Sequence, residues 1–201
     1  MEGFLPVTAT RLPMHQVSLA GTVYEQHPGV FSAGHIDYAT QFLLEEWSTN
    51  PLLLDLPAPE SIIDIGCGNG VIGDQLLARY PRAHLTATDV SELALASARH
   101  NLRQHGFGER VKVLTASSLA AVLDPALFDL IVTNPPFHDG HQTDISVPLE
   151  IFQTASGRLS PAGALVVVAN RHLNYLTHLR RYFAEVRIVA ENNKFVIYRC
   201  R

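Results

Sequence analysis

Short apolar runs alternate with segments of helical periodicity along most of the chain. Apolar runs with the length of β-strands occur at residues 61–65, 83–89, 110–116, 127–134 and 164–170. Segments with apolar residues at helical spacing occur at residues 36–47, 71–80, 91–106 and 146–158. Strands and helices in this order are typical of a parallel sheet with helices on both faces. The pattern therefore predicts an α/β fold, in which ligands bind at the carboxyl ends of the strands.

Both ends of the chain depart from this alternation. Near the C-terminus, a helical pattern at residues 173–183 precedes two apolar runs, 186–190 and 194–200, which a short polar turn separates. This spacing predicts a terminal hairpin that adds an antiparallel strand to the sheet. Near the N-terminus, residues 15–32 alternate around Gly21 and predict a small hairpin.

Composition limits the class of protein. Hydrophobic residues make up 47% of the 201 residues and charged residues 17%, which indicates a folded globular chain. Cys67 and Cys200 are the only cysteines, so a disulfide framework and a cysteine zinc site are disfavoured. No apolar run approaches the roughly 18 residues of a membrane span, and we expect a cytoplasmic protein. We expect residues 1–28 to form an N-terminal tail with a possible β-hairpin and residues 29–201 to form the main domain.

The net charge of −4 is unevenly distributed along the chain. Eight basic and two acidic residues follow position 157, so the C-terminal part is basic and the preceding part is acidic. The bias reflects either an ordinary solvated surface or a basic flank for a phosphate backbone. Composition leaves both interpretations open.

A glycine-rich loop follows the first predicted strand of the sheet. The stretch DIGCGNG begins at Asp64, ends at Gly70 and opens a helix, so its backbone can approach an anionic or polar ligand closely. The dinucleotide fingerprint would place a third glycine where Val71 stands, which disfavours an NAD-dependent oxidoreductase. Asp89 ends the next strand, 19 positions after Gly70, where an acid can accept hydrogen bonds from ribose hydroxyls.

The stretch NPPF, Asn134 to Phe137, forms a stiff elbow after the strand predicted at 127–134. Prolines cannot donate to a strand ladder, so the strand ends there and the preceding carboxamide is fixed in space. The Asn134 Oδ1 and the Pro135 carbonyl can accept hydrogen bonds from an exocyclic amine and orient its lone pair. Phe137 offers a flat face on which a base can stack.

These three features together resemble the class I S-adenosylmethionine-dependent methyltransferases. The resemblance implies a Rossmann-like α/β fold with a seven-stranded, mostly parallel sheet and a C-terminal antiparallel hairpin. It implies that the first acid and the glycine loop hold the methionine part of S-adenosylmethionine, the second acid holds the ribose, and the residue that ends the third strand, placed here at Ser117, touches adenine. The cofactor-binding residues are then Asp64, Gly66, Cys67, Gly68, Asn69, Gly70, Asp89, Val90, Ser117 and Asn134.

Four further stretches narrow the resemblance to the ribosomal RNA guanine-N2 methyltransferases. They are PGVFS at 28–32, NPPFHDGHQTD at 134–144, VANRHLNY at 168–175 and NNKFVIYR at 192–199. Large-subunit enzymes of that family are most similar and small-subunit enzymes come second. The resemblance implies methyl transfer to a guanine N2 amine in ribosomal RNA, with Asn134, Pro135, Pro136 and Phe137 as catalytic residues.

Four further residues are expected near the cofactor or the target RNA because of their positions in the sequence. Phe31 covers the cofactor or the target base, unless it belongs to the core, and His138 lines the base pocket. Asn170 and Arg171 face the mouth of the site, and a surface ion pair is the alternative for Arg171. His138, His141 and Asp144 have a spacing compatible with a metal, but no other ligand supports one, and we expect no metal.

Other functions remain open at this stage. NPPF also occurs in enzymes that methylate adenine N6 or protein glutamine, and a cofactor-binding RNA module without catalysis is a further alternative. The chain also differs from the family, whose members carry two methyltransferase-like domains. We expect it to be a fragment or a single-domain relative. Two glycines that usually follow PGVFS are His35 and Ala39 here, while Asp37 matches the family. The sequence says nothing about oligomeric state.

Overall fold

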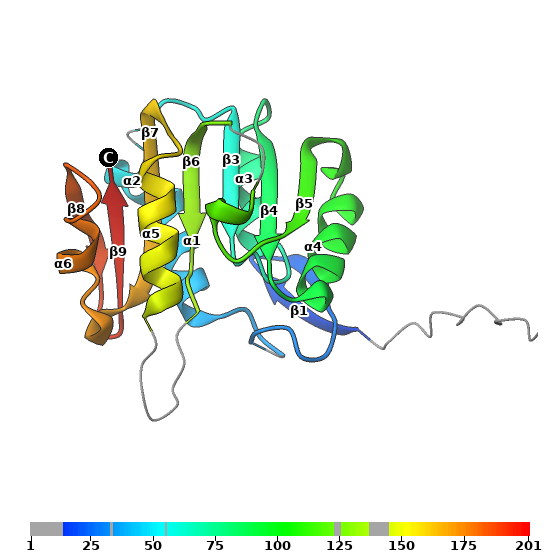
Figure 1. Ribbon diagram of the computed structural model, residues 1–201. Helices are drawn as coiled ribbons and strands as arrows, with labels where there is room; N and C mark the ends of the chain where they lie inside the picture. The colour runs from blue at the N-terminus through cyan, green and yellow to red at the C-terminus, as the bar shows by residue number, and fades with distance from the viewer. Residues whose placement is uncertain (1–13, 33, 55, 123–125, 137–144) are drawn as a thin grey trace, which may run out of the picture.

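The main sheet has seven strands and is mostly parallel. The computed structural model describes residues 14–32, 34–54, 56–122, 126–136 and 145–201. The strands are β3 (Ser61–Ile65), β4 (His84–Asp89), β5 (Val111–Thr115), β6 (Phe128–Thr133), β7 (Leu159–Asn170), β8 (Val186–Glu191) and β9 (Phe195–Cys200). Their order is β5-β4-β3-β6-β7-β9-β8, and β9 runs antiparallel to β7 and β8 (Figure 1). The fold predicted from the sequence is confirmed.

The order of the strands places a switch point at the centre of the sheet. From β3 the chain builds outward through β4 to β5, and it then returns to place β6 on the other side of β3. The loops after β3 and β6 therefore diverge to opposite faces of the sheet. In Figure 1 the parallel strands end at the lower edge. This edge is where an open α/β sheet binds ligands.

Helices cover both faces of the sheet. The α-helices are α1 (Tyr38–Thr49), α2 (Pro51–Leu54), α3 (Val71–Arg79), α4 (Glu92–Gln104), α5 (Ser146–Ser156) and α6 (Leu176–Leu179). Short 3₁₀ turns occur at η1 (Gly108–Arg110), η2 (Leu119–Ala121) and η3 (Arg171–Leu173). Among the described residues, no helix has the length and apolar character needed to cross a membrane.

Two hydrophobic clusters lie on opposite faces of the sheet. One packs Ile62 and Leu130 against residues of α1, α3 and α4. The other packs Ile63 and Ile131 against α5, which lies in front of β6 and β7 in Figure 1. Neighbouring residues of a strand point to opposite faces, so β3 and β6 contribute to both clusters and are buried on both sides. This burial fixes the strand ends from which the loops of the site emerge.

The hairpin expected near the N-terminus is present and packs against the main domain. β1 (His15–Leu19) pairs antiparallel with β2 (Thr22–Gln26) around Ala20 and Gly21. Both turn residues have positive φ, 49° and 86°, as a tight two-residue hairpin requires. Val17 and Tyr24 are buried in the same cluster as α3 and α4. The hairpin is thus a packed part of the fold.

The prediction of a helix over residues 173–183 was wrong in its extent. Only the single turn α6 is α-helical there, and the 3₁₀ turn η3 precedes it. Asn174 separates the two turns and has φ 45° and ψ 51°, a left-handed conformation that a continuous helix excludes. The apolar spacing that suggested a helix instead reflects the burial of Tyr175 and Leu179 against the sheet.

Candidate active site

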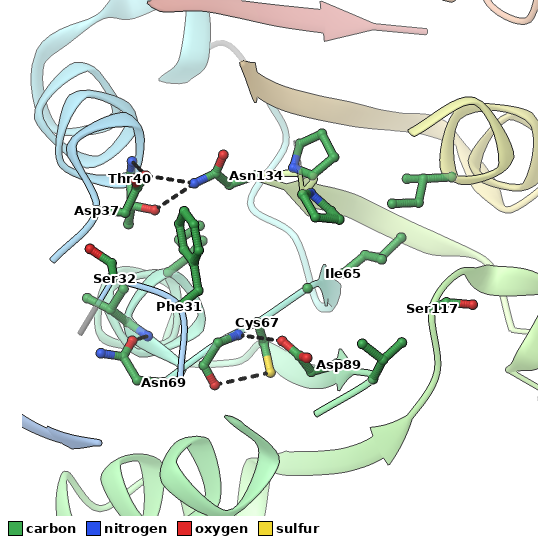
Figure 2. A pocket seen from close by; sticks show the side chains of 18 of the residues that line it. Phe31, Ser32, Asp37, Thr40, Ile65, Cys67, Asn69, Asp89, Ser117 and Asn134 are labelled. Carbon is green, nitrogen blue, oxygen red and sulfur yellow. Dashed lines mark hydrogen bonds between the residues drawn. The ribbon is translucent and has the colours of Figure 1, made fainter. Parts of the chain in front are cut away.

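A cavity of about 340 Å³ lies at the carboxyl ends of β3, β4 and β6. Its wall comes from the loops after these strands and after β5, from the segment that enters α1, and from the first turns of α5. A cavity of this size is typical of a small-molecule site. The sequence placed the glycine loop, the second acid and the elbow at these strand ends, and the structure brings them together around one cavity (Figure 2).

The part of the glycine loop that follows β3 forms one wall of the cavity. Gly66, Cys67, Gly68 and Asn69 line it, whereas Gly70 does not. Gly66 has φ 76° and Gly68 has φ 54°, conformations that residues with a Cβ atom adopt at a cost. The N–H groups of Gly66 and Cys67 both donate to the Thr88 carbonyl at 2.8 Å, which ties the loop to β4. The backbone is therefore held in a fixed shape beside the cavity.

Asp89 closes β4 and is positioned by the loop next to it. Its Oδ2 accepts a hydrogen bond from the Gly68 N–H at 3.0 Å, and its Oδ1 accepts one from the Ser91 N–H at 2.9 Å. Each oxygen of a carboxylate has a second lone pair, so both can still accept a ligand hydroxyl. Asp89 lines the cavity, and its contact with a ribose stays a prediction.

Asp64 lies within β3 and is fully buried below the loop. It is not part of the cavity wall, so its direct contact with a cofactor stays a prediction. Among the described residues, neither of its carboxylate oxygens has a hydrogen-bond partner. Burial and the charge of Asp89 raise the pKa of Asp64 to about 7, and the nearby amide of Gly73 opposes part of this rise. An unpaired buried acid in this position favours a positively charged ligand nearby.

Part of the cavity wall is mostly apolar. Val90 follows Asp89 and is 68% exposed, and Ala116 and Ser117 follow β5. Together with Ile151 from α5, these residues line the cavity. Val90 and Ser117 therefore lie on the cavity wall, and their contact with a cofactor stays a prediction. Apolar side chains of this kind on a cavity wall suit contact with a flat aromatic ring.

The elbow contributes Asn134, Pro135 and Pro136 to the cavity wall. The Nδ2 of Asn134 donates to Oδ2 of Asp37 at 2.8 Å and to Oγ1 of Thr40 at 3.1 Å (Figure 2). A carboxylate can only accept, so the amide nitrogen must face Asp37. The Oδ1 of Asn134 is left as an acceptor. The predicted amine-orienting group therefore has a fixed orientation.

Asp37 and Thr40 are site residues for which no role was predicted from the sequence. Asp37 caps α1 by accepting a 3.0 Å hydrogen bond from the Thr40 N–H, and both residues line the cavity. The Asp37 match to the family pattern was the available signal. Its contact with Asn134, 97 positions away, appears only in the fold.

The remaining predicted residues divide into three groups. Phe31 lines the cavity and is 61% exposed, so a simple core role is wrong. Asn170 and Arg171 lie at the end of β7 and outside the cavity, and Arg171 contacts Glu191 at 3.6 Å, the predicted alternative of a surface ion pair. Phe137 and His138 lie outside the described residues.

The described part of the chain contains no cluster of metal-ligating side chains. No group of three or more histidine, cysteine or acidic side chains there could hold a metal ion. His141 and Asp144, two of the three residues considered for a metal, lie outside the described residues, as His138 does.

Residues 21–199 match the model of the methyltransferase small domain. The chain belongs to this family. A ribosomal RNA large subunit methyltransferase G from Streptomyces coelicolor is 38% identical over 190 residues, which cover 93% of this chain and 48% of that protein. A ribosomal RNA small subunit methyltransferase C from Haemophilus influenzae is 37% identical over 177 residues, which cover 88% of this chain and 50% of that protein.

A solved structure resembles this fold over nearly its whole length. The T. thermophilus 16S rRNA N2 methyltransferase RsmC, in complex with AdoMet and guanosine, has a TM-score of 0.80 and is 25% identical. The match covers 94% of this chain and 50% of that one. The chain therefore spans about half the length of the relatives that it matches. A ribosomal protein L11 methylase, 17% identical with a TM-score of 0.64, shares the fold.

Proposed function

We propose that this chain transfers a methyl group from S-adenosylmethionine to the exocyclic N2 amine of a guanine in ribosomal RNA. The observation that carries the proposal is the orientation of Asn134, whose nitrogen is held by α1 and whose oxygen is left to accept a hydrogen bond from an amine. Membership of the methyltransferase small domain family supports the same reaction, as do relatives named for ribosomal RNA methylation.

The residues around the cavity fit S-adenosylmethionine in size, charge and hydrogen bonding. Asp89 retains acceptor capacity for the ribose hydroxyls, and the apolar part of the wall at Val90, Ala116 and Ile151 suits the adenine ring. The glycine loop offers its backbone to the methionine part. The unpaired Asp64 below it is stabilised in its ionised form by a nearby positive charge, which the methionine part carries.

The chain's own groups act mainly by positioning the acceptor. The cofactor supplies a methyl group on a positively charged sulfur, which is already activated for transfer. An exocyclic amine is a weak nucleophile because its lone pair is delocalised into the ring. The Asn134 Oδ1 and the Pro135 carbonyl accept its two N–H bonds and direct the lone pair out of the ring plane. Pro135 and Pro136 keep these acceptors rigid, and the proton leaves to solvent after transfer.

Further residues would hold the RNA around the target base. Phe31 at the cavity mouth and Phe137 of the elbow offer aromatic faces for bases, and His138 lies beside Phe137 in the sequence. Asn170 and Arg171 end β7 at the same edge of the sheet as the cavity. Arg171 and Lys194 place basic side chains at this edge for RNA phosphates, whereas Arg187 and Arg199 lie towards the opposite end of the sheet.

The position of the site also suggests how the chain is divided. Residues 29–201 include every residue assigned to the site, and we assign catalysis to them. The hairpin of β1 and β2 precedes them and packs against α3 and α4. A cytoplasmic location is consistent with the proposed substrate, ribosomal RNA.

An Asn134→Ala variant tests the role of the elbow. Transfer of labelled methyl groups to ribosomal RNA should fall about 100-fold or more, because the amine loses its fixed acceptor. The dissociation constant for S-adenosylmethionine, measured by calorimetry, should change little. The matched control is Asn193→Ala, which alters an exposed residue in the turn between β8 and β9. A catalytic rate equal to wild type in the Asn134 variant would refute the proposal.

A further inference from the structure

We infer that Asp37 determines specificity for guanine: one of its carboxylate oxygens holds Asn134, and the other accepts the N1–H of the target base. This inference rests on the proposed function and deepens it. The Asn134 amide distinguishes an amine from a group without N–H bonds, but it does not distinguish guanine from adenine. A second acceptor beside it is needed to make that distinction.

The position of Asp37 places its carboxylate beside the amine-orienting amide. Its Oδ2 accepts from the Thr40 N–H at 3.0 Å and from the Asn134 Nδ2 at 2.8 Å. These two hydrogen bonds, one from the first turn of α1 and one from the elbow, hold Oδ2 in place. Asp37 is half-buried and lines the same cavity as Asn134. Figure 2 shows the two side chains facing each other across the cavity wall.

The second carboxylate oxygen of Asp37 has no assigned donor. Within the described ranges, both hydrogen bonds to this side chain reach Oδ2, and none reaches Oδ1. A half-buried carboxylate oxygen on a cavity wall favours a ligand that brings an N–H donor. Asp37 and Asn134, which are hydrogen-bonded to each other, therefore each present an Oδ1 oxygen as an acceptor.

Guanine matches this arrangement and adenine does not. The Watson–Crick edge of guanine carries two neighbouring donors, the N1–H and the N2 amine. Adenine carries an amine beside N1, which is a lone-pair acceptor, and the carboxylate would repel it. A glutamine side chain has an amide nitrogen without a neighbouring ring N–H. Enzymes that act on a base taken out of its stack read this edge by hydrogen bonds. Asp37 thus selects the base, while Asn134 orients its amine.

An Asp37→Asn variant separates the two oxygens of Asp37. Its amide oxygen can take over both hydrogen bonds of Oδ2, and Asn caps helices as well as Asp does, so α1 and Asn134 should be retained. Only the second oxygen changes, from an acceptor to an NH₂ donor. The probes are guanosine and 2-aminopurine riboside, which keeps the 2-amine but has an acceptor at N1. Their dissociation constants are measured in the presence of S-adenosylhomocysteine.

Wild type should bind guanosine at least tenfold more tightly than 2-aminopurine riboside, as a hydrogen bond to a charged group predicts. Asp37→Asn should weaken guanosine binding by roughly 10- to 100-fold and leave 2-aminopurine riboside binding unchanged or stronger. Thr40→Val, which removes the other acceptor of the Asn134 Nδ2, should lower the methylation rate but keep the wild-type preference. Melting temperatures of both variants report whether the fold is intact.

Three results would overturn the inference. They are no preference in wild type, no measurable binding of either nucleoside, and an equal loss for both nucleosides in Asp37→Asn. A failure of the proposed function gives a different pattern. In that case Asp37→Asn would abolish or reverse the nucleoside preference as expected, but wild type would transfer no methyl group to ribosomal RNA.

Discussion

Tyr24 donates a 2.7 Å hydrogen bond to Oδ2 of Asp74, and this buried contact joins the N-terminal hairpin to the helix that follows the glycine loop. The other oxygen of Asp74 lies 2.7 Å from Nδ1 of His105, at the end of α4. Burial raises the pKa of Tyr24 well above its ordinary value, so the phenol remains a proton donor. Gln75 donates to the same phenol oxygen at 2.8 Å. One cluster thus links β2, α3 and α4.

Removing the phenol should destabilise the fold. Tyr24→Phe leaves the Gln75 amide without its acceptor and Asp74 without one donor, so the free energy of unfolding should fall by about 1–3 kcal/mol. Urea denaturation measures this change. The control is Tyr38→Phe, whose ring is 64% exposed and which should change stability by less than about 0.5 kcal/mol. Equal effects of the two substitutions would show that the buried cluster contributes nothing.

Gly70, in the glycine loop, should tolerate substitution by alanine less well than Gly106, which has the same φ. Gly70 and Gly106 both have φ 85°, so alanine at either costs about 1–2 kcal/mol of backbone strain. A Cβ at Gly70 would also lie 3.1 Å from Ala98 Cα, whereas nothing lies within 4 Å of a Cβ at Gly106. Gly70→Ala should therefore be less stable by roughly a further 1–3 kcal/mol. Denaturation curves of the two variants test this difference.

Asp64 should make the stability of the ligand-free protein depend on pH. Its pKa of about 7 in the folded state exceeds its ordinary value of 3.8, so the folded protein binds more protons than the unfolded chain between these values. The free energy of unfolding should then fall as the pH rises from about 4 to 7, by at most about 1.4 kcal/mol per unit. Asp64→Asn should lose this contribution. Urea denaturation at several pH values measures the slope of the free energy of unfolding against pH. Equal slopes in wild type and Asp64→Asn would contradict the prediction.

Asp89 should be needed for cofactor binding rather than for the stability of the sheet alone. Asp89→Asn keeps one acceptor oxygen but replaces the other with a donor, so the affinity for S-adenosylmethionine should fall about tenfold or more. Asp129 provides a matched control, because its carboxylate also accepts from two backbone amides, those of Glu60 and Ser61, at the opposite end of the sheet. Asp129→Asn should lower stability and leave the dissociation constant for the cofactor near wild type.

The sequence predicted those parts of the site that follow directly from strand ends. Gly66 and Asn134 come after apolar runs, and parallel strands align their carboxyl ends, so both had to meet at one edge. The environment of Asp64 could not be predicted, because β3 is buried on both faces and its pattern does not show which way a side chain points. The apolar spacing at 173–183 predicted a helix because such a pattern carries no information about the left-handed backbone of Asn174.

The contact between Asp37 and Asn134 could not be predicted from sequence patterns for a different reason. It depends on the start of α1 packing beside the end of β6, which only the assembled fold determines. Arg171 gives a second example, since its hydrogen bond to the Asn192 carbonyl at 3.0 Å requires the terminal hairpin to fold back beside β7. Both contacts join residues that no local periodicity connects.

The most direct test of the central claim is methyl transfer to ribosomal RNA. Tritium-labelled S-adenosylmethionine is incubated with the protein and with ribosomal RNA from cells that lack the modification, and the RNA is digested to nucleosides. The proposal predicts a labelled N2-methylguanosine peak that disappears with Asn134→Ala. Label in another nucleoside, or no label while calorimetry shows bound cofactor, would contradict it.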